Sequence, residues 1–323
     1  MDAPTSSGLL DLDGQSVYWE EWGNPEGVPA LYLHGGPGSV LRSGYRQRFD
    51  LDRFRVVGMQ QRGAGRSVPL AGEPGHDLGA NTTQRLIADI EALRGHLGIE
   101  RWLLNGVSWG ATLTLAYAQA HRDRVAGIVL MAVTTTSAEE VHWITEGCQM
   151  LYPEAWDELA TWAEQHHPGY LRGKAPLVAV MAEVMRSSDR EQQIEAARAW
   201  GRWEDWHTSI GSGYAAELET TEPDVAVPFA TLVTHYWSHH AFLEPPILDR
   251  MNLLRDVPSV LIHGRKDVSG PAVTPWLLHR RWPASELVIV EQEGHGGPQM
   301  VDAWSRANAA MAERLQPQTD RSA

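Results

Sequence analysis

Short apolar runs alternate with stretches of helical period along most of the chain. The apolar runs occupy residues 30–36, 55–65, 102–108, 126–133, 258–267 and 285–297. Helical patterns lie between several of them, and at 81–99 either Asn81 or Thr82 is a suitable N-cap. Buried strands that alternate with helices predict a mostly parallel sheet with helices on both faces, which is an α/β fold.

Two regions depart from this alternation. At the N-terminus, apolar and polar residues alternate on both sides of Asp13-Gly14, which predicts a β-hairpin with a two-residue turn. From about residue 136 to residue 240 the sequence is helical and has no strand-like run. We therefore expect residues 1–135 and 241–323 to form the α/β core, and residues 136–240 to form a helical cap over the C-terminal ends of the strands.

The expected cap is rich in tryptophan. It holds half of the 14 tryptophans in the chain: Trp143, Trp156, Trp162, Trp200, Trp203, Trp206 and Trp237. Packing among helices explains such a concentration, and so does an aromatic pocket beneath a lid. The sequence leaves both explanations open.

Charge and cysteine content exclude several classes of partner. The formal net charge of -14 disfavours nucleic acid and anionic membranes, because both repel an acidic surface. A single cysteine, Cys148, forms no internal disulfide and no thiolate metal site, which fits a reducing compartment. The acidic N-terminus does not resemble a signal peptide, and the apolar run at 128–133 is too short to span a membrane. We expect a cytoplasmic protein.

The segment Asn105–Gly110 carries the pattern GxSxG between a buried strand and a helix. A serine on such a sharp turn projects its hydroxyl from the sheet, and the residues around it must be small because strand and helix approach closely. We therefore expect Ser108 to be a nucleophile. The helix that follows directs the Trp109 N–H toward it, as one donor of an oxyanion hole.

The second oxyanion donor should lie in a loop after an early strand. The segment His34–Gly38, with the sequence HGGPG, has that position. Glycine lets a backbone N–H approach a substrate oxygen without an intervening side chain. We assign the second donor to Gly36 and a substrate contact to Gly35.

Two further residues complete a predicted catalytic triad. In this fold the chain order is nucleophile, acid, histidine. Asp267 follows the apolar run at 258–267, and His295 follows the next one, so both lie at C-terminal strand ends, where catalytic groups collect. The remaining histidines, including His166-His167 and His239-His240, are not spaced as metal ligands, so we expect neither a metal nor another cofactor.

These motifs together resemble the proline iminopeptidases, a branch of the α/β-hydrolases that removes N-terminal proline from peptides. The likeness covers nearly the whole chain. The matching segments are HGGPG at 34–38, QRGAGRS at 61–67, NGVSWGATL at 105–113, YPEAWD at 152–157, AWGRWE at 199–204, HGRKD at 263–267 and GH at 294–295. The resemblance implies a serine aminopeptidase with an α/β-hydrolase core and a cap.

The resemblance also suggests how a substrate amine is bound. It implies that Glu204, beside Trp203, is one of the carboxylates that neutralise the terminal ammonium. A second glutamate of the family is replaced by Val233, which we expect at the same substrate site. Further departures are Gln60, Lys266 and Gly270, which stand where the family has Asp, Tyr and Cys.

We therefore expect hydrolysis of an amide or ester through an acyl-enzyme, with a small peptide that begins with proline or a small residue as first choice of substrate. An amidase or esterase that acts on another small molecule is the main alternative, and a non-catalytic binder on the same fold is a third. Epoxide hydrolase or dehalogenase chemistry requires a carboxylate in place of Ser108. The sequence does not indicate an oligomeric state.

Overall fold

The protein is built around one eight-stranded sheet, shown in a computed structural model that describes residues 3–210 and 221–315. The strands are β1 (Ser6–Leu12), β2 (Gln15–Gly23), β3 (Val28–Leu33), β4 (Phe54–Met59), β5 (Trp102–Val107), β6 (Val125–Met131), β7 (Ser259–Gly264) and β8 (Ser285–Val290). Their order is β1-β2-β4-β3-β5-β6-β7-β8. β2 pairs antiparallel with β1 and β4, and the pairs from β4 to β8 are parallel, which confirms the predicted mostly parallel sheet.

The predicted hairpin is formed by β1 and β2. Leu12 pairs with Gln15, so the turn consists of Asp13 and Gly14 alone. Both turn residues have positive φ, 44° and 81°, which is the combination that a two-residue turn of the primed type requires.

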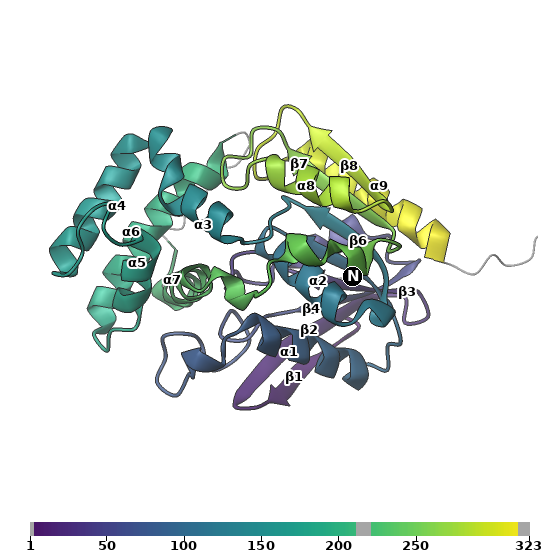
Figure 1. The fold of residues 1–323 in the computed structure, drawn as a ribbon. Helices are drawn as coiled ribbons and strands as arrows, with labels where there is room; N and C mark the ends of the chain where they lie inside the picture. Colours follow the sequence, from purple (N-terminus) through teal and green to yellow (C-terminus); the bar gives the residue numbers. More distant parts are fainter. Residues whose placement is uncertain (1–2, 211–220, 316–323) are drawn as a thin grey trace, which may run out of the picture.

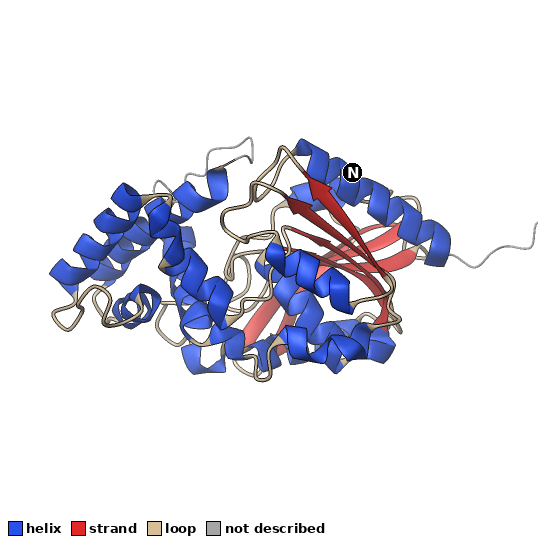
Figure 2. Ribbon diagram, turned by 45° about the horizontal axis from the view of Figure 1, so that its top comes forward, coloured by secondary structure: helices blue, strands red, loops and turns tan. Residues whose placement is uncertain are grey.

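Helices cover both faces of the sheet (Figures 1 and 2). Adjacent strand residues point to opposite faces. Leu104 therefore belongs to the core cluster that includes side chains of α1 (Thr83–His96), α2 (Trp109–Ala120) and α8 (Val273–Arg281), whereas Leu103 belongs to the cluster that includes α9 (Pro298–Leu315). Thr82, one of the two predicted caps, accepts a hydrogen bond from the Arg85 N–H at the start of α1.

Among the described residues between β6 and β7 there are five α-helices, which gather beside the sheet, on the left in Figure 1. They are α3 (Ala138–Thr145), α4 (Pro153–His166), α5 (Leu177–Met185), α6 (Arg190–Ser209) and α7 (Pro223–Ser238). Short 3-10 helices occupy Ser43–Arg48, Leu78–Ala80, Arg122–Arg124, Gly147–Met150, His240–Phe242 and Ile247–Leu254. The division into a core of residues 1–135 and 241–323 and a cap of residues 136–240 stays a prediction. Residues 1–2, 211–220 and 316–323 of these ranges lie outside the described residues.

The tryptophans of this helical segment serve mainly to pack it. Trp200 and Trp203 are buried among the helices, and the Trp156 indole donates a hydrogen bond to the Thr145 carbonyl. Trp206 is exposed. Of the seven tryptophans, Trp237 alone is in the described lining of the two cavities at Ser108, so packing accounts for the tryptophan content better than an aromatic pocket at the serine does.

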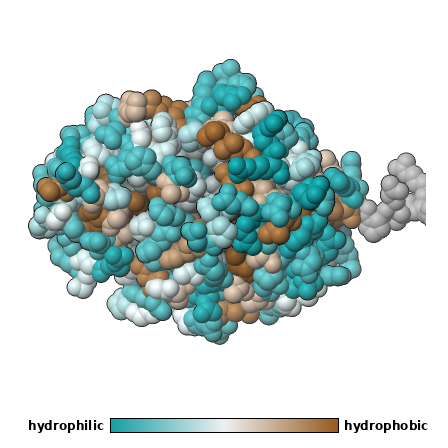
Figure 3. Space-filling model, viewed as in Figure 1, coloured by the Kyte–Doolittle hydropathy of each residue, from teal (hydrophilic) through white to brown (hydrophobic). Residues whose placement is uncertain are grey.

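The face of the molecule that is drawn in Figure 3 is largely polar. Hydrophilic residues cover most of the face drawn in Figure 3, and hydrophobic ones are scattered between them. Among residues 3–210 and 221–315, no helix combines the length and apolar character needed to cross a bilayer.

Candidate active site

Ser108 occupies a strained turn between β5 and α2. Its backbone angles are φ 56° and ψ −126°, a region that costs a residue other than glycine about 1–3 kcal/mol. The neighbouring glycines leave the space that this turn needs. A Cβ on Gly106 would lie 2.3 Å from the Gly110 carbonyl oxygen, and one on Gly110 would lie 2.1 Å from that of Leu33. The sequence thus allows strand and helix to meet at the serine.

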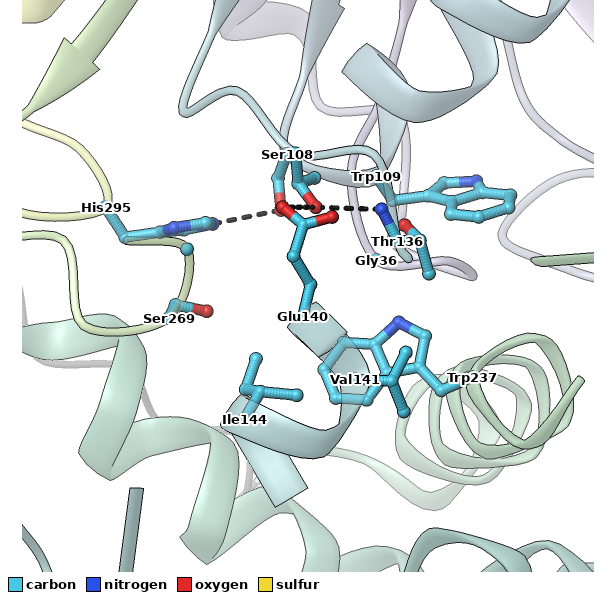
Figure 4. Close-up of a pocket in the computed structure, with 12 residues that line it drawn as sticks. Gly36, Ser108, Trp109, Thr136, Glu140, Val141, Ile144, Trp237, Ser269 and His295 are labelled. Carbon is cyan, nitrogen blue, oxygen red and sulfur yellow. Dashed lines mark hydrogen bonds between the residues drawn. The ribbon is translucent and has the colours of Figure 1, made fainter. Parts of the chain in front are cut away.

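The residues predicted as a triad lie together at the C-terminal ends of three strands. His295 Nε2 is 2.9 Å from Ser108 Oγ, and His295 Nδ1 is 2.9 Å from Asp267 Oδ2. The second carboxylate oxygen of Asp267 accepts a hydrogen bond from the Gly270 N–H at 2.9 Å. Figure 4 shows the His295 ring directed at the Ser108 hydroxyl. This order of hydrogen bonds lets the imidazole take the serine proton while the carboxylate orients it.

The environment of the triad lowers the pKa of Asp267 and raises the pKa of His295. Burial opposes ionisation of Asp267, but the charge and hydrogen bond of His295 outweigh it and lower the pKa of that carboxyl. Burial likewise opposes the imidazolium of His295, but Asp267, with a contribution from Glu204, raises its pKa above the ordinary value. Asp267 is therefore a carboxylate, and His295 is a stronger base than a free histidine.

Two buried side chains that the sequence analysis missed hold the loops of this site. His263 Nδ1 accepts a hydrogen bond from the Val133 N–H at 3.0 Å, so its Nε2–H donates to the Gly270 carbonyl at 2.7 Å. Glu293 accepts hydrogen bonds from the N–H groups of Gln299 and Met300 in the first turn of α9. His263 lies within the matching segment 263–267, and Glu293 directly precedes the one at 294–295. These positions are the sequence signal for the two residues.

The glycine loop lies on the other side of Ser108. Gly36 has a φ of 110°, and a Cβ there would lie 2.6 Å from the Gly38 nitrogen, so only glycine fits. A Cβ on Gly35 would approach that of Ser108 to 3.2 Å. The Trp109 N–H belongs to the first turn of α2, where N–H groups have no partner within the helix. Gly36 lines both cavities at Ser108, and Trp109 lines the smaller of them.

Buried polar residues fix this loop in place. The Gln61 N–H donates to His34 Nε2 at 3.0 Å, so His34 is neutral and its Nδ1–H faces the Gly35 carbonyl at 2.9 Å. Burial accordingly lowers the pKa of His34 to about 4. Gln60 accepts from the Leu41 N–H at 2.7 Å and donates to the Ser39 carbonyl at 2.8 Å. The glutamine at 60, where the resembled family has Asp, therefore binds the loop that follows Gly36.

Gln61 also connects this loop to the nucleophile helix. Its side-chain carbonyl accepts a hydrogen bond from the Trp109 indole at 2.8 Å, while its amide donates to the His34 carbonyl at 2.9 Å. The two predicted oxyanion donors are thus positioned by one shared network.

Two cavities meet at Ser108 and His295. The smaller, of about 40 Å³, has an apolar wall of Val141, Ile144 and Trp237 opposite the serine, seen in Figure 4. Its remaining lining is Gly36, Trp109, Thr134, Thr136, Glu140, Ser269 and Gly270. The larger, of about 1030 Å³, extends past the glycine loop. Its lining includes Glu204, Phe229, Arg42 and Arg48.

Glu204 is the one predicted amine-binding carboxylate at these cavities. It lies on α6, lines the larger cavity and is almost completely buried. Burial raises its pKa to about 8, although the Trp200 indole, which donates to Oε1 at 3.0 Å, acts in the opposite direction. A buried carboxyl that faces a cavity is well suited to receive a cation.

Two predicted substrate residues are placed differently from what the sequence suggests. Trp203 lines neither cavity, since its side chain packs edge-on against His207 and its indole donates to the Ile144 carbonyl at 3.2 Å. Val233 on α7 is completely buried and also lines neither, although it lies one turn from both Phe229 and Trp237. The rotation of each helix about its own axis relative to its neighbours decides which side chains reach the site. This rotation cannot be predicted from the periodicity of the sequence alone.

No group of three or more His, Cys, Asp or Glu side chains suited to a metal occurs within the described ranges 3–210 and 221–315. Cys148 is buried, and its burial, together with the charge of Asp267, raises the pKa of its thiol to about 12.

The sequence matches a family model described as the alpha/beta hydrolase fold over residues 29–180. It is 42% identical over 298 residues to a probable proline iminopeptidase of Streptomyces coelicolor, with 90% of each chain covered. It is 37% identical to a proline iminopeptidase of Arabidopsis thaliana, with 90% of this chain and 75% of the plant protein covered.

Solved structures agree on the fold. A proline iminopeptidase-related protein of Thermus thermophilus superposes with a TM-score of 0.60 at 21% identity, over 96% of this chain and 99% of that one. An esterase from Rhodococcus gives a TM-score of 0.58 at 20% identity, over 96% of this chain and 99% of that one. Since several relatives exceed 30% identity over most of both chains, this chain belongs to the proline iminopeptidase family of α/β-hydrolases.

Proposed function

We propose that this protein is a serine aminopeptidase that releases an N-terminal proline, or another small residue, from short peptides. The observation that carries the proposal is the arrangement of Ser108, His295 and Asp267 beside a cavity that also holds Glu204. A nucleophile and a buried carboxyl at one cavity match a substrate whose amine lies next to its scissile bond. The relatives named as proline iminopeptidases support the same reaction.

The reaction proceeds through an acyl-enzyme. Ser108 Oγ attacks the scissile carbonyl carbon while His295 Nε2 takes its proton, and Asp267 stabilises the imidazolium that forms. The N–H groups of Gly36 and Trp109 hold the oxyanion of the tetrahedral intermediate. The intermediate collapses as His295 gives its proton to the leaving nitrogen. Water, activated by the same histidine, then hydrolyses the ester and regenerates Ser108.

The two cavities divide the substrate between them. The small apolar cavity beside Val141, Ile144 and Trp237 takes the side chain or ring of the first residue. The larger cavity takes the rest of the peptide, with the free amine directed at Glu204. The small cavity limits the first residue to a compact group such as the pyrrolidine ring of proline.

The wider setting follows from the same observations. We assign residues 136–240 to a cap that supplies Glu204 and Trp237 to the site, over a core of residues 1–135 and 241–323. We also place the enzyme in the cytoplasm, a compartment that suits its single, buried cysteine.

A fluorophosphonate probe, applied to the wild type and to Ser108→Ala, tests the hydrolase proposal directly. We expect the probe to label the wild type alone, and Ser108→Ala to lose at least about three orders of magnitude in kcat, since the covalent route is removed. A variant that keeps more than a tenth of the wild-type rate contradicts the assignment of the nucleophile.

A panel of chromogenic substrates tests the substrate class. The panel contains proline, alanine and acetyl derivatives, with free and blocked amines. Preference for free proline supports the aminopeptidase. Preference for blocked amides or esters favours the amidase or esterase alternative. That alternative is a serious rival because Val233 stands where the resemblance implies a second amine-binding glutamate.

A further inference from the structure

A buried histidine stands directly behind the proposed amine site. His207 lies one turn after Glu204 on α6, and its Nε2 is 3.5 Å from Glu204 Oε2. Its Nδ1 is 3.1 Å from the hydroxyl of Ser269. Glu204 and Ser269 line the larger cavity, whereas the side chain of His207 is completely buried. His207 thus connects two groups that face the substrate without facing it itself.

Only one of the two ring nitrogens of His207 has a hydrogen-bond partner among the described residues. Its Nε2 has no hydrogen-bond partner among the described residues and points toward the carboxyl of Glu204. Burial, together with the nearby charge of His295, lowers the pKa of His207 to about 3. A neutral imidazole has one N–H donor and one acceptor nitrogen, so it matches either form of a neighbouring carboxyl by a change of tautomer.

The polar and charged groups around this pair come from several elements. Arg42, Arg48 and Glu222 line the larger cavity together with Glu204. Trp200 donates to the far oxygen of Glu204, and Asp205 follows it on α6. His295 and Asp267 face the pair from the sheet side, where both belong to the proposed triad. α7 packs against α6 through the uncharged Trp237, whose ring lies 5.8 Å from that of Trp200.

We propose that His207 is a positioning residue of the amine site, which with Ser269 gives the Glu204 carboxyl a hydrogen-bond partner in both of its protonation states. This inference rests on the proposed role of Glu204 as the group that receives the substrate ammonium.

The two states differ by one proton. In the proposed empty state, the O–H of protonated Glu204 is directed at His207 Nε2, which lies 3.5 Å from Glu204 Oε2, and the Nδ1–H of the same ring donates to the Ser269 oxygen. When an ammonium binds, the Glu204 proton moves to Nε2, the Nδ1 proton moves to the Ser269 oxygen, and the hydroxyl proton of Ser269 leaves to cavity water. The carboxylate then accepts from the Nε2–H, and Nδ1 accepts from Ser269. Binding of a free amine therefore releases one proton, whereas a blocked amine releases none.

Steady-state kinetics of proline and N-acetyl-proline anilides between pH 6 and pH 9.5 test this role. The variants are His207→Leu, which fills the space but has no donor or acceptor, His207→Gln, which has both, and Ser269→Ala. His235→Leu is the matched control, because His235 is also a buried histidine with an unpartnered nitrogen but lines neither cavity.

In the wild type we expect KM for the proline anilide to fall as pH rises toward 8. His207→Leu should raise that KM about ten-fold and move its midpoint to higher pH, since the carboxylate loses a donor. It should leave kcat and the N-acetyl substrate within about two-fold. With His207→Gln, the KM for the proline anilide should return most of the way to the wild-type value. Ser269→Ala should raise this KM less than His207→Leu does, and His235→Leu should leave it unchanged.

The outcomes separate the inference from the function on which it rests. If His207→Leu and Ser269→Ala both leave the KM and its midpoint unchanged while Glu204→Gln raises KM, the positioning role is wrong and the amine site stands. If Glu204→Gln also has no effect, the amine is not bound at Glu204, and both proposals fail. Equal losses on free and blocked substrates would reduce His207 to a packing residue.

Discussion

Asp267 and His295 depend on each other for their charge states, and the pH dependence of activity should report this. The base must be neutral to accept the serine proton. Because Asp267 raises the pKa of His295, kcat/KM for an N-blocked substrate should rise with pH through a midpoint above about 6.5.

Asp267→Asn is the matching variant. It removes the charge that stabilises the imidazolium and favours the wrong tautomer, so kcat should fall by about 10⁴-fold and the midpoint should move to lower pH. Stopped assays over pH 5–9 provide the measurement. A wild-type midpoint below 6 would contradict the pairing.

Val233 stands where the resemblance implies a second carboxylate, and introducing one there should have two opposing effects. Val233 lies on α7, one turn from Phe229 and Trp237, which line the larger cavity. The longer side chain of Val233→Glu should therefore reach this cavity and lower KM for free-amine substrates about ten-fold. It should also lower the melting temperature, because Val233 is completely buried and a carboxyl there loses its hydration. An unchanged preference for free over acetylated proline would place the new carboxyl outside the site.

At the scale of elements, the turn between β5 and α2 depends on two glycines. Gly106→Ala or Gly110→Ala would drive a Cβ against backbone atoms 2.1–2.3 Å away. Backbone cannot move aside as a side chain can, so we expect a loss of about 3 kcal/mol or more in the free energy of unfolding. Gly95→Ala is the control: Gly95 lies in α1, and a Cβ there meets nothing within 4 Å. It should stabilise by about 0.5–1 kcal/mol. Urea denaturation of the three variants measures these changes in the free energy of unfolding, and equal values for all three would contradict the prediction.

At the scale of the whole molecule, sheet and helical segment share one apolar core. A single cluster runs from Leu104 and Leu130 in the sheet to Ile144, Trp200 and Trp203 between the helices. Elements that share a core lose their packing together. We expect thermal unfolding followed by tryptophan fluorescence and by far-UV circular dichroism to give coincident transitions. A separate, earlier fluorescence transition would mean that the helices of residues 136–240 fold independently.

Local sequence patterns were sufficient to predict three features. Hydrophobic periodicity predicted the parallel sheet and the β1–β2 hairpin, and the GxSxG motif predicted the position of Ser108. These features depend on local properties: alternation within a strand, a two-residue turn of Asp13-Gly14, and small residues at a sharp turn. Asp267 and His295 could be placed as well, because parallel strands bring their C-terminal ends to one edge. The helix α8 was not anticipated, since its short apolar pattern at Val273–Arg281 is weak.

Tertiary packing decided what surrounds the triad. Whether a helical side chain reaches the cavity depends on how each helix is rotated against its neighbours, which is why Glu204 lies at the site while Trp203, next to it in sequence, packs away from it. His207 and Ser269 are 62 residues apart and meet only because α6 lies over the loop after β7. A periodic pattern states which residues share a face, but contacts between distant segments arise only when those faces are packed together.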